Sequence, residues 1–432
     1  MAVQLDALIV GAGFGGTYQL HKLRSAGYNV KLIDSALDFG GVWHWNCYPG
    51  VRVDSPIPMY EFSLPELWTN WTWKERFPSG QELQDYFAYV ADKLDLRKDA
   101  IFGEWVSSAV FDQGEGRWVV ETDKGSVFKV RYLLLNVGSS TTKYVPPFKG
   151  LDAFKGQLII PSRWKKGTDL SGRKIAIIGT GPTGLQLIQE MGKIAKELVV
   201  FQRTPSLALP LGQVSFSGKD QSHPKSKYPE IFDGRNHSYG GFDYNFLPKG
   251  TFDDTPEQRR AVYEELWKQG DFKYWLATYH DMLFDKAANK EAYDFWCEKT
   301  RARIHDPRAR DLLAPLVQPY SFGCKRVPLE QGYYEVFNQA NVHLVDLHAT
   351  PIEVITETGI KTPEKEWEFD AIIMATGYNA VIGSLISIDI RGPSGESISE
   401  KWKDGMTTFL GMATKGFPNM FFTYGPQAPT VC

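Results

Sequence analysis

The chain is poor in cysteine and in long apolar runs, and both absences exclude classes of protein. Its 432 residues include four scattered cysteines, Cys47, Cys297, Cys324 and Cys432, without a C-x-x-C pair or metal-ligand spacing. This pattern indicates neither a disulfide framework nor a metal site, so a reduced cytoplasmic environment is expected. No apolar run approaches the roughly 20 residues of a membrane span, and the N-terminus lacks the basic and apolar regions of a secretory signal.

An excess of charge of one sign is missing as well. Lysine and arginine together number 48, against 51 aspartates and glutamates, which gives a formal net charge of −3. Such a chain has no general attraction for nucleic acid or for an anionic membrane surface. The length allows two or three domains, and the oligomeric state is not predicted.

The first feature that carries chemistry is the glycine-rich turn "GAGFGG" near the N-terminus. An apolar strand precedes it, a helix follows, and the next strand ends at Asp34, which together predict a βαβ unit. Gly11 permits a tight turn, Gly13 lets the backbone approach a pyrophosphate, and Gly16 lets the helix pack closely on the strand. The helix N-terminus favours the phosphate charge, and Asp34 can accept from ribose hydroxyls. The unit therefore predicts a bound dinucleotide.

A second turn of the same kind, formed by Gly179, Gly181 and Gly184, ends differently. Its following strand closes with "VVFQRT", which places Arg203 and Thr204 where the first unit has its acid. An acid at this point repels a 2′-phosphate, whereas an arginine attracts one. The second nucleotide is therefore predicted to be NADPH.

Two nucleotides in one chain imply an electron relay in which NADPH reduces a flavin, FAD, held by the first unit. The stretch "GGVWHWNCYPG" (40–50) can enclose an extended isoalloxazine with aromatic residues and glycines. Disulfide reductases combine the same two turns with a redox-active cysteine pair. Only Cys47 lies in the relevant loop and no partner is near it in the sequence, so that class is rejected. A simple NADPH oxidase or a monooxygenase remains.

The predicted fold class is α/β, with two Rossmann-like dinucleotide-binding domains and a helical insertion. Residues 1–144 and 377–432 are assigned to the FAD-binding domain, 145–210 and 322–376 to the NADP-binding domain, and 211–321 to the insertion. The stretch "TPEQRRAVYEELWKQ" supports the insertion, because Thr255 can cap a helix with Pro256 at its first position and Gln258 at its third.

Several motifs together resemble those of the Baeyer–Villiger monooxygenases, which depend on FAD and NADPH. They are "GAGFGG", "GGVWHWNCYPGVRVD", "GTGPTG" with "FQRTP", "FGCKRVPLEQGYYEVFNQANVHLVDL", "ATGY" and "FPNMFFTYGP", and they cover nearly the whole chain. The resemblance implies that NADPH reduces FAD and that O2 then forms a flavin peroxide. It further implies that this peroxide attacks a small-molecule ketone to give an ester or a lactone.

The resemblance also implies roles for particular residues. Arg326 of "CKR" would stabilise the peroxyflavin, and Asp54 of "GVRVD" would position Arg326. Lys325 and Arg203 would bind the 2′-phosphate of NADP. An arginine suits the first role because it stays charged. Since Pro328 favours extended backbone before it, Lys325 and Arg326 are expected to point in opposite directions.

The complete predicted sites combine the two turns with this resemblance. The FAD site comprises Gly11, Gly13, Phe14, Gly16, Asp34, Val42, Trp43, Trp45, Asp54, Tyr60 and Val106. The NADP site comprises Thr180, Gly181, Pro182, Thr183, Gly184, Gln186, Arg203, Thr204, Lys325 and Arg326.

Two departures from the family pattern qualify the interpretation. The family fingerprint F-x-G-x-x-x-H-x-x-x-W reads "FKGQLIIPSRW" here, so Ile160 stands at the histidine position. Isoleucine forms no side-chain hydrogen bond, and leakage of hydrogen peroxide is expected. The sequence also stops at Cys432, where family members continue, which predicts loosely held FAD. An N- or S-oxygenating enzyme, against which "CKR" and "VRVD" argue, and a nucleotide-binding homologue without oxygenase activity remain as alternatives.

Overall fold

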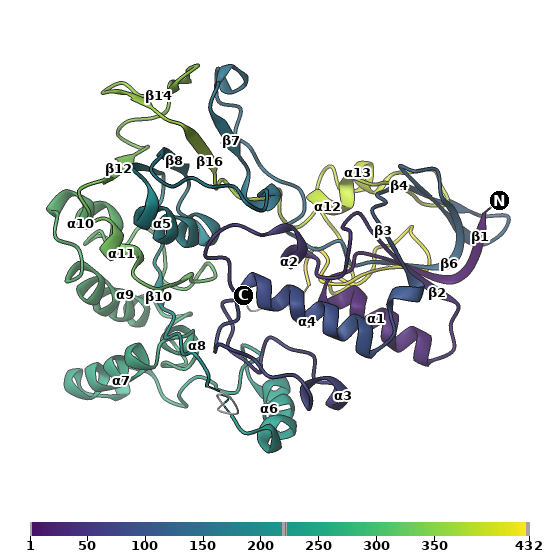
Figure 1. The fold of residues 1–432 in the computed structure, drawn as a ribbon. Helices are drawn as coiled ribbons and strands as arrows, with labels where there is room; N and C mark the ends of the chain where they lie inside the picture. The colour runs from purple at the N-terminus through teal and green to yellow at the C-terminus, as the bar shows by residue number, and fades with distance from the viewer. Residues whose placement is uncertain (1, 218–220, 222, 429–432) are drawn as a thin grey trace. The chain divides into compact units, whose positions relative to one another are not determined.

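The computed structural model describes residues 2–217, 221 and 223–428, which form two compact units. The first unit consists of the described parts of Met1–Cys47, Gly80–Val145 and Gly377–Thr430. The second consists of Tyr48–Ser79 and the described part of Pro146–Thr376. Figure 1 shows the chain coloured from its N-terminus to its C-terminus.

The first unit is built on a mixed sheet with strand order β17-β4-β5-β6-β1-β2-β3, and β18 pairs with β6. β1 runs parallel to both β2 and β6, whereas β5 is antiparallel to β4 and β6. The strands are β1 (Val3–Val10), β2 (Val30–Asp34), β3 (Ala100–Phe102), β4 (Val106–Asp112), β5 (Arg117–Thr122), β6 (Val127–Leu135), β17 (Asp389–Arg391) and β18 (Met420–Phe422). The run "ALIV" in β1 is buried throughout, as expected for a parallel strand covered on both faces.

Short helices and two long ones accompany this sheet. They are α1 (Phe14–Ser25), α2 (Val42–Trp45), α4 (Gly80–Lys93), α12 (Gly383–Ile386), α13 (Ile398–Lys401) and the 3₁₀ helix η1 (Arg97–Asp99). The ring of Phe14, the first residue of α1, meets that of Phe87 in α4 edge to face at 4.7 Å between centroids. The aromatic contact fixes the start of α1, which begins within the motif "GAGFGG".

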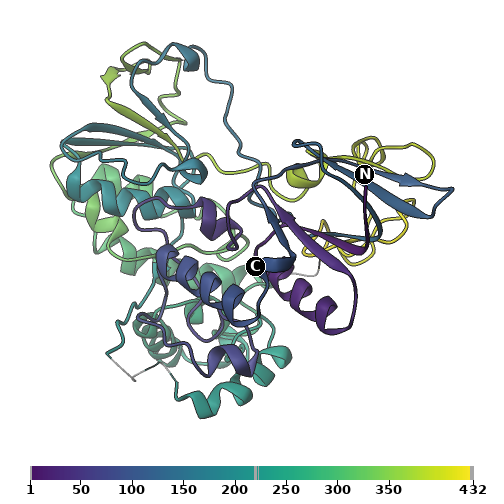
Figure 2. The ribbon, with the colours of Figure 1, turned by 45° about the vertical axis from the view of Figure 1, so that its right-hand side comes forward.

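The second unit contains a parallel sheet with strand order β12-β9-β8-β16-β7. Its strands are β7 (Gln157–Ile159), β8 (Lys174–Ile178), β9 (Glu197–Gln202), β12 (Val342–Asp346) and β16 (Ala371–Met374). Two smaller sheets pair β10 (Leu209–Pro210) with β11 (Leu329–Glu330), and β14 (Gly359–Lys361) with β13 (Val354–Ile355) and β15 (Glu366–Glu368). α5 (Pro182–Ile194) packs on the five-stranded sheet and α11 (Tyr333–Val336) packs on α5 (Figure 2).

Helices dominate residues 228–313 of this unit. They are α6 (Tyr228–Gly234), α7 (Pro256–Gln269), α8 (Lys273–Leu276), α9 (Lys286–Arg301) and α10 (Pro307–Leu313), besides α3 (Pro65–Trp68) earlier in the chain. The 3₁₀ helices are η2 (Leu151–Ala153), η3 (Pro161–Arg163), η4 (Lys225–Lys227), η5 (Arg235–His237) and η6 (Thr251–Asp253). Thr255 and Gln258 form the capping box that the sequence predicts at the start of α7.

The predicted α/β class with two glycine-turn units is confirmed. Residues 48–79 belong to the second compact unit, and their predicted place in the FAD-binding domain stays a prediction. Backbone hydrogen bonds explain their place in the second unit, because Arg76 N–H donates to Val214 O at 2.8 Å and Phe216 N–H donates to Lys74 O at 2.7 Å. Residues 429–432, including Cys432, lie outside the described part. Among the described helices, none has the length and apolar character needed to cross a membrane.

Candidate functional site

The first glycine turn has the geometry that its sequence predicts. Gly11 has a φ of +110°, and a Cβ there would lie 2.3 Å from the Asn136 carbonyl oxygen. A Cβ on Gly16 would lie 1.8 Å from the Gly11 carbonyl oxygen. A Cβ on Gly13 would meet only Gly41 Cα at 3.6 Å, an ordinary contact. Packing therefore requires glycine at the outer positions, whereas the middle one leaves room for a ligand at the N-terminus of α1.

Asp34 holds this turn through its carboxylate. Oδ2 accepts from the Ala12 N–H at 2.6 Å, and Oδ1 accepts from the Ala36 N–H at 2.7 Å. Each carboxylate oxygen can accept a second hydrogen bond, and the residue is only partly buried. Asp34 can therefore bind a ribose hydroxyl while it braces the turn.

The aromatic loop after β2 is held by α4. Gln84 Nε2 donates to the Trp43 carbonyl oxygen at 2.7 Å. Trp43 is buried, whereas Trp45 is partly exposed and Val42 is 37% exposed. Trp43 is thus the only buried residue of α2, and Val42, His44 and Trp45 all have exposed surface.

Three residues predicted for FAD lie outside the first glycine turn and the loop after β2. Val106 begins β4 with its side chain in the hydrophobic core, so its backbone, next to an irregularity in the β4–β5 register, is the group available for contact. Asp54 and Tyr60 belong to the second unit. Their assignment to FAD stays a prediction.

The second glycine turn repeats the geometry of the first. Gly179 has a φ of +106°, and a Cβ there would lie 2.4 Å from the Ala375 carbonyl oxygen, which belongs to the "ATGY" motif. A Cβ on Gly184 would lie 2.2 Å from the Gly179 carbonyl oxygen, whereas one on Gly181 would meet nothing within 4 Å. The hydroxyl of Thr180 donates to the Thr204 carbonyl oxygen at 2.9 Å and so ties the turn to the end of β9.

Basic groups gather near that strand end. Arg203 follows β9 and is exposed. Lys325 Nζ lies 4.5 Å from the ring centroid of Tyr320, whose hydroxyl donates to the Pro205 carbonyl oxygen at 2.9 Å. The structure thus connects Lys325 to the segment that follows Arg203, as a shared phosphate site requires.

The neighbouring Arg326 binds Asp54 through a bidentate ion pair. Nε donates to Oδ2 at 2.7 Å and Nη2 to Oδ1 at 2.8 Å, and both side chains are 34% exposed. Nη2 also lies 3.4 Å from Ser55 Oγ, and the guanidinium stacks 4.8 Å from the Phe272 ring centroid. Lys325 and Arg326 therefore have different neighbours, as the extended segment before Pro328 predicts.

Comparison with known proteins shows which family this chain belongs to. Residues 5–214 match the family described as pyridine nucleotide-disulphide oxidoreductase. Cyclopentanone 1,2-monooxygenase of Comamonas sp. is 47% identical over 427 residues, which cover 99% of this chain and 78% of that protein. The Baeyer–Villiger monooxygenase of Pseudooceanicola batsensis is 37% identical, covering 99% of this chain and 79% of that protein. The chain is a Baeyer–Villiger monooxygenase by family.

Solved structures of Baeyer–Villiger monooxygenases have the same fold. OTEMO in complex with FAD and NADP is 38% identical, has a TM-score of 0.95, and covers 99% of this chain and 81% of that one. The predicted family and cofactor pair agree with these relatives. Among the described cysteines, Cys47, Cys297 and Cys324 all carry free thiols, so none of them forms the cysteine pair of a disulfide reductase.

Two residues beside the candidate site of this Baeyer–Villiger family member were not predicted from sequence. A third residue, Gln186, was predicted for NADP and has hydrogen-bond partners within the protein. Phe272 and Tyr320 support Arg326 and Lys325, yet no local pattern marks them. Gln186 accepts from the Tyr48 hydroxyl at 2.9 Å and donates to the Arg52 carbonyl oxygen at 3.1 Å. Its side chain therefore holds the loop that leads to Asp54, and contact with NADP stays a prediction.

Glu61 is a buried acid in the same segment as Asp54, with an exposure of 5%. Burial raises its pKa to about 7, opposed chiefly by the nearby Lys225 and less by Trp73, Tyr228 and Arg235. The folded protein therefore binds more protons than the unfolded chain between pH 4.5 and 7. The stability that the neutral acid contributes is present below this window and is lost as the pH rises through it.

We expect Glu61→Gln to raise the melting temperature by a few degrees at pH 8 and to leave it almost unchanged at pH 5, because glutamine stays neutral. Thermal unfolding at both pH values measures the difference. Glu66→Gln, at an exposed position five residues away, is the matched control. An equal change for Glu61→Gln at both pH values would contradict the raised pKa.

Proposed function

We propose that this protein is an NADPH-dependent FAD monooxygenase that inserts one oxygen atom beside a ketone carbonyl to give an ester or a lactone. The observation that carries the proposal is the bidentate Asp54–Arg326 pair, in the same unit as the second glycine turn. The names of the relatives support it, since cyclopentanone 1,2-monooxygenase and acetone monooxygenase (methyl acetate-forming) act on ketones. A cytoplasmic location belongs to the proposal and is supported by the free thiols.

The residues present fit both cofactors. At the first turn, the room beside Gly13 and the N-terminus of α1 suit the FAD pyrophosphate, and Asp34 suits its ribose. FAD held there would supply the redox chemistry that passes electrons from NADPH to O2, and one atom of that O2 would enter the ketone. At the second turn, Gly181 and the N-terminus of α5 suit the pyrophosphate of NADPH.

The 2′-phosphate of NADPH is assigned to Arg203, Thr204 and Lys325. Arg203 and Thr204 follow β9. Lys325 lies over the ring of Tyr320, whose hydroxyl donates to the Pro205 carbonyl oxygen in the same segment. Charge-assisted hydrogen bonds of this kind are stronger than neutral ones. This arrangement explains a preference for NADPH, because NADH has no group for the three side chains to bind.

Arg326 is assigned to the oxygen-transfer step. Its guanidinium cannot lose its proton at neutral pH, so its charge is permanent. Asp54 binds two of its nitrogens, which fixes the plane of the guanidinium and its position over Phe272. A fixed positive charge of this kind stabilises negative charge that develops on oxygen. Both side chains of the pair are 34% exposed, so the ion pair is only partly buried.

A ketone panel under limiting NADPH tests the proposed function. For each ketone, ester or lactone is measured by gas chromatography beside the NADPH consumed and the hydrogen peroxide released. Ester formation from at least one ketone, dependent on both NADPH and O2, is expected. Sulfoxide or N-oxide as the sole product from a mixed panel would favour the N- or S-oxygenating alternative. Reduction of FAD without any oxygenated product would favour the homologue without oxygenase activity.

Ile160 predicts that this enzyme releases hydrogen peroxide beside its product. It follows β7 and is the N-cap residue of the 3₁₀ helix η3, where its carbonyl oxygen accepts from the Arg163 N–H at 2.8 Å. Its side chain is apolar where the family fingerprint has histidine. Ile160→His should lower the peroxide released per NADPH oxidised, and Leu158→His, at a 42% exposed position of β7, should not. A wild-type enzyme that releases no peroxide would contradict this prediction.

A further inference from the structure

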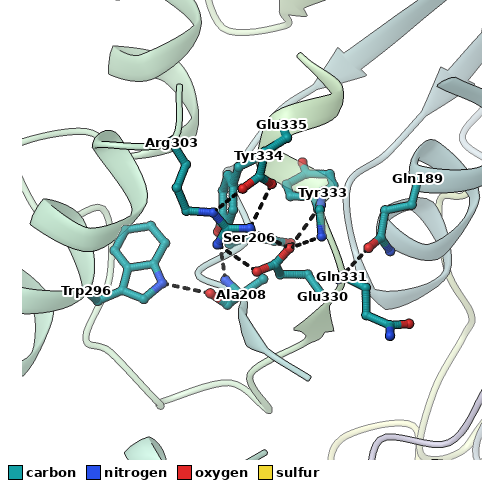
Figure 3. A network of polar contacts seen from close by, with 11 residues as sticks. Gln189, Ser206, Ala208, Trp296, Arg303, Glu330, Gln331, Tyr333, Tyr334 and Glu335 are labelled. Carbon is teal, nitrogen blue, oxygen red and sulfur yellow. Dashed lines mark hydrogen bonds and ion pairs between the residues drawn. The ribbon is translucent and has the colours of Figure 1, made fainter. Parts of the chain in front are cut away.

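A network of polar groups joins the helical region to the segment that carries Lys325 and Arg326 (Figure 3). At its centre is Glu330 in β11, whose side chain is 1% exposed. Arg303 donates to its two oxygens from Nη1 at 2.7 Å and from Nη2 at 3.0 Å. The N–H groups of Gly332 and Tyr333 donate to Oε2 at 2.8 and 3.0 Å. Four donor contacts thus compensate the buried carboxylate.

Arg303 binds a second carboxylate with the same guanidinium. Nε donates to Glu335 Oε1 at 2.5 Å and Nη2 to Glu335 Oε2 at 2.8 Å. The guanidinium also lies 5.2 Å from the ring centroid of Tyr334. The backbone carbonyl oxygen of Arg303 accepts from Asn338 Nδ2 at 2.9 Å. The planar guanidinium of Arg303 fixes the direction as well as the length of its hydrogen bonds to the two carboxylates. The ammonium group of a lysine cannot reproduce this geometry.

The same network fixes the backbone on both sides of the candidate phosphate site. β11 pairs with β10, where Leu209 N–H donates to Pro328 O and Leu211 N–H donates to Glu330 O, both at 2.9 Å. β10 follows the Arg203 segment in the sequence, and β11 follows Lys325. The spacing of the two segments is therefore set at this short pair of strands.

Tyr334 adds a second tie to the Arg203 segment. Its hydroxyl donates to the Ser206 carbonyl oxygen and accepts from the Ala208 N–H, both at 3.0 Å. Trp296 of α9 donates to the Ala208 carbonyl oxygen at 2.8 Å, and Ser206 Oγ donates to the Thr180 carbonyl oxygen in the second glycine turn. Figure 3 shows Tyr334, Ser206 and Ala208 beside Glu330, with Trp296 reaching Ala208 from α9.

We propose that Arg303 and Glu330 are positioning residues for NADPH, holding Lys325 at the spacing from Arg203 that a 2′-phosphate requires. The two phosphate-binding cations belong to separate segments, so both can bind one phosphate only while those segments keep their register. Neither Arg303 nor Glu330 is assigned a contact with the nucleotide. The inference rests on the NADPH-binding part of the proposed function and is independent of oxygen insertion.

The test compares nucleotides that differ only in the 2′-phosphate. Arg303→Met should raise the KM for NADPH about tenfold, the effect of weakening one charge-assisted contact. The KM for NADH and the kcat with either nucleotide should change by less than about twofold, because the rest of the site is unaltered. Calorimetric titration with 2′,5′-ADP should show the same loss of affinity, whereas titration with 5′-AMP should not. Arg303→Lys should restore little of the loss, because it keeps the charge and lacks the planar guanidinium.

Two further variants separate positioning from general stability. Arg301→Met removes the last residue of α9, two positions before Arg303. The Arg301 guanidinium donates to the Ala314 carbonyl oxygen at 2.7 Å and to Asp311 at 2.8 Å. It should lower the melting temperature without weakening 2′,5′-ADP binding. Arg303→Met with Glu330→Gln avoids an uncompensated buried charge, and the glutamine oxygen can still accept from Gly332 and Tyr333. This double variant should fold and still bind 2′,5′-ADP about tenfold more weakly.

Wild-type affinity for 2′,5′-ADP in the folded double variant would overturn the inference, and so would an equal loss for 5′-AMP and 2′,5′-ADP. A wild-type enzyme without preference for NADPH over NADH would overturn both the inference and the NADPH assignment. A wild-type enzyme that prefers NADPH but forms no ester would contradict the proposed oxygenation alone. In that case, loss of 2′,5′-ADP binding in Arg303→Met would still support the positioning role.

Discussion

Arg326→Ala should reduce ester formation by at least about a hundredfold while NADPH still reduces the flavin. One preorganised donor facing a developing oxyanion contributes about 2.7–4 kcal/mol, and its loss costs that much in the oxygen-transfer step. Hydride transfer places no comparable demand on this side chain. Stopped-flow bleaching of the flavin absorbance by NADPH, measured beside ester yield, separates the two steps.

Two variants sharpen this prediction. Asp54→Ala should slow both steps, because an arginine without its bidentate partner can turn away from either task. Arg260→Ala removes an arginine that is 52% exposed and paired with Glu298 in the helical region, and it should leave both steps unchanged. Normal ester yield from Arg326→Ala would remove this residue from the mechanism and weaken the Baeyer–Villiger assignment with it.

Arg203→Ala should raise the KM for NADPH by about tenfold or more and leave the use of NADH almost unchanged. A hydrogen bond to a charged group contributes about 1.5–3 kcal/mol, and tenfold in affinity corresponds to about 1.4 kcal/mol. NADH lacks the 2′-phosphate and loses nothing. Steady-state oxidation of both nucleotides gives the two KM values.

Arg173 provides a control for this variant on the same parallel sheet. It directly precedes β8 and is 59% exposed, so it lies at the amino ends of the strands, whereas Arg203 lies at the carboxyl ends. Nucleotides bind at the carboxyl ends of such sheets. Arg173→Ala should therefore change neither KM. A similar loss with NADPH and NADH in Arg203→Ala would show that the residue is needed for folding and does not bind the 2′-phosphate.

The local features of the fold could be predicted from sequence because their causes are local. Gly11 and Gly179 adopt φ values of +110° and +106° that glycine tolerates and other residues rarely adopt. The capping box at Thr255 depends on residues three positions apart. The apolar strands that flank each turn follow from their own composition. These signals determine both nucleotide-binding turns, and with them the α/β class.

Only the tertiary structure decides which distant side chains meet. Arg326 and Asp54 are 272 positions apart, and the sequence alone pairs them only through the family resemblance. Phe272 beneath Arg326 and the Arg303–Glu330 pair have no local signal. The segment 48–79 joins the second unit through backbone hydrogen bonds to residues 214–216, which no periodicity encodes. Such contacts depend on how whole elements pack, whereas turns and caps depend on the few residues that form them.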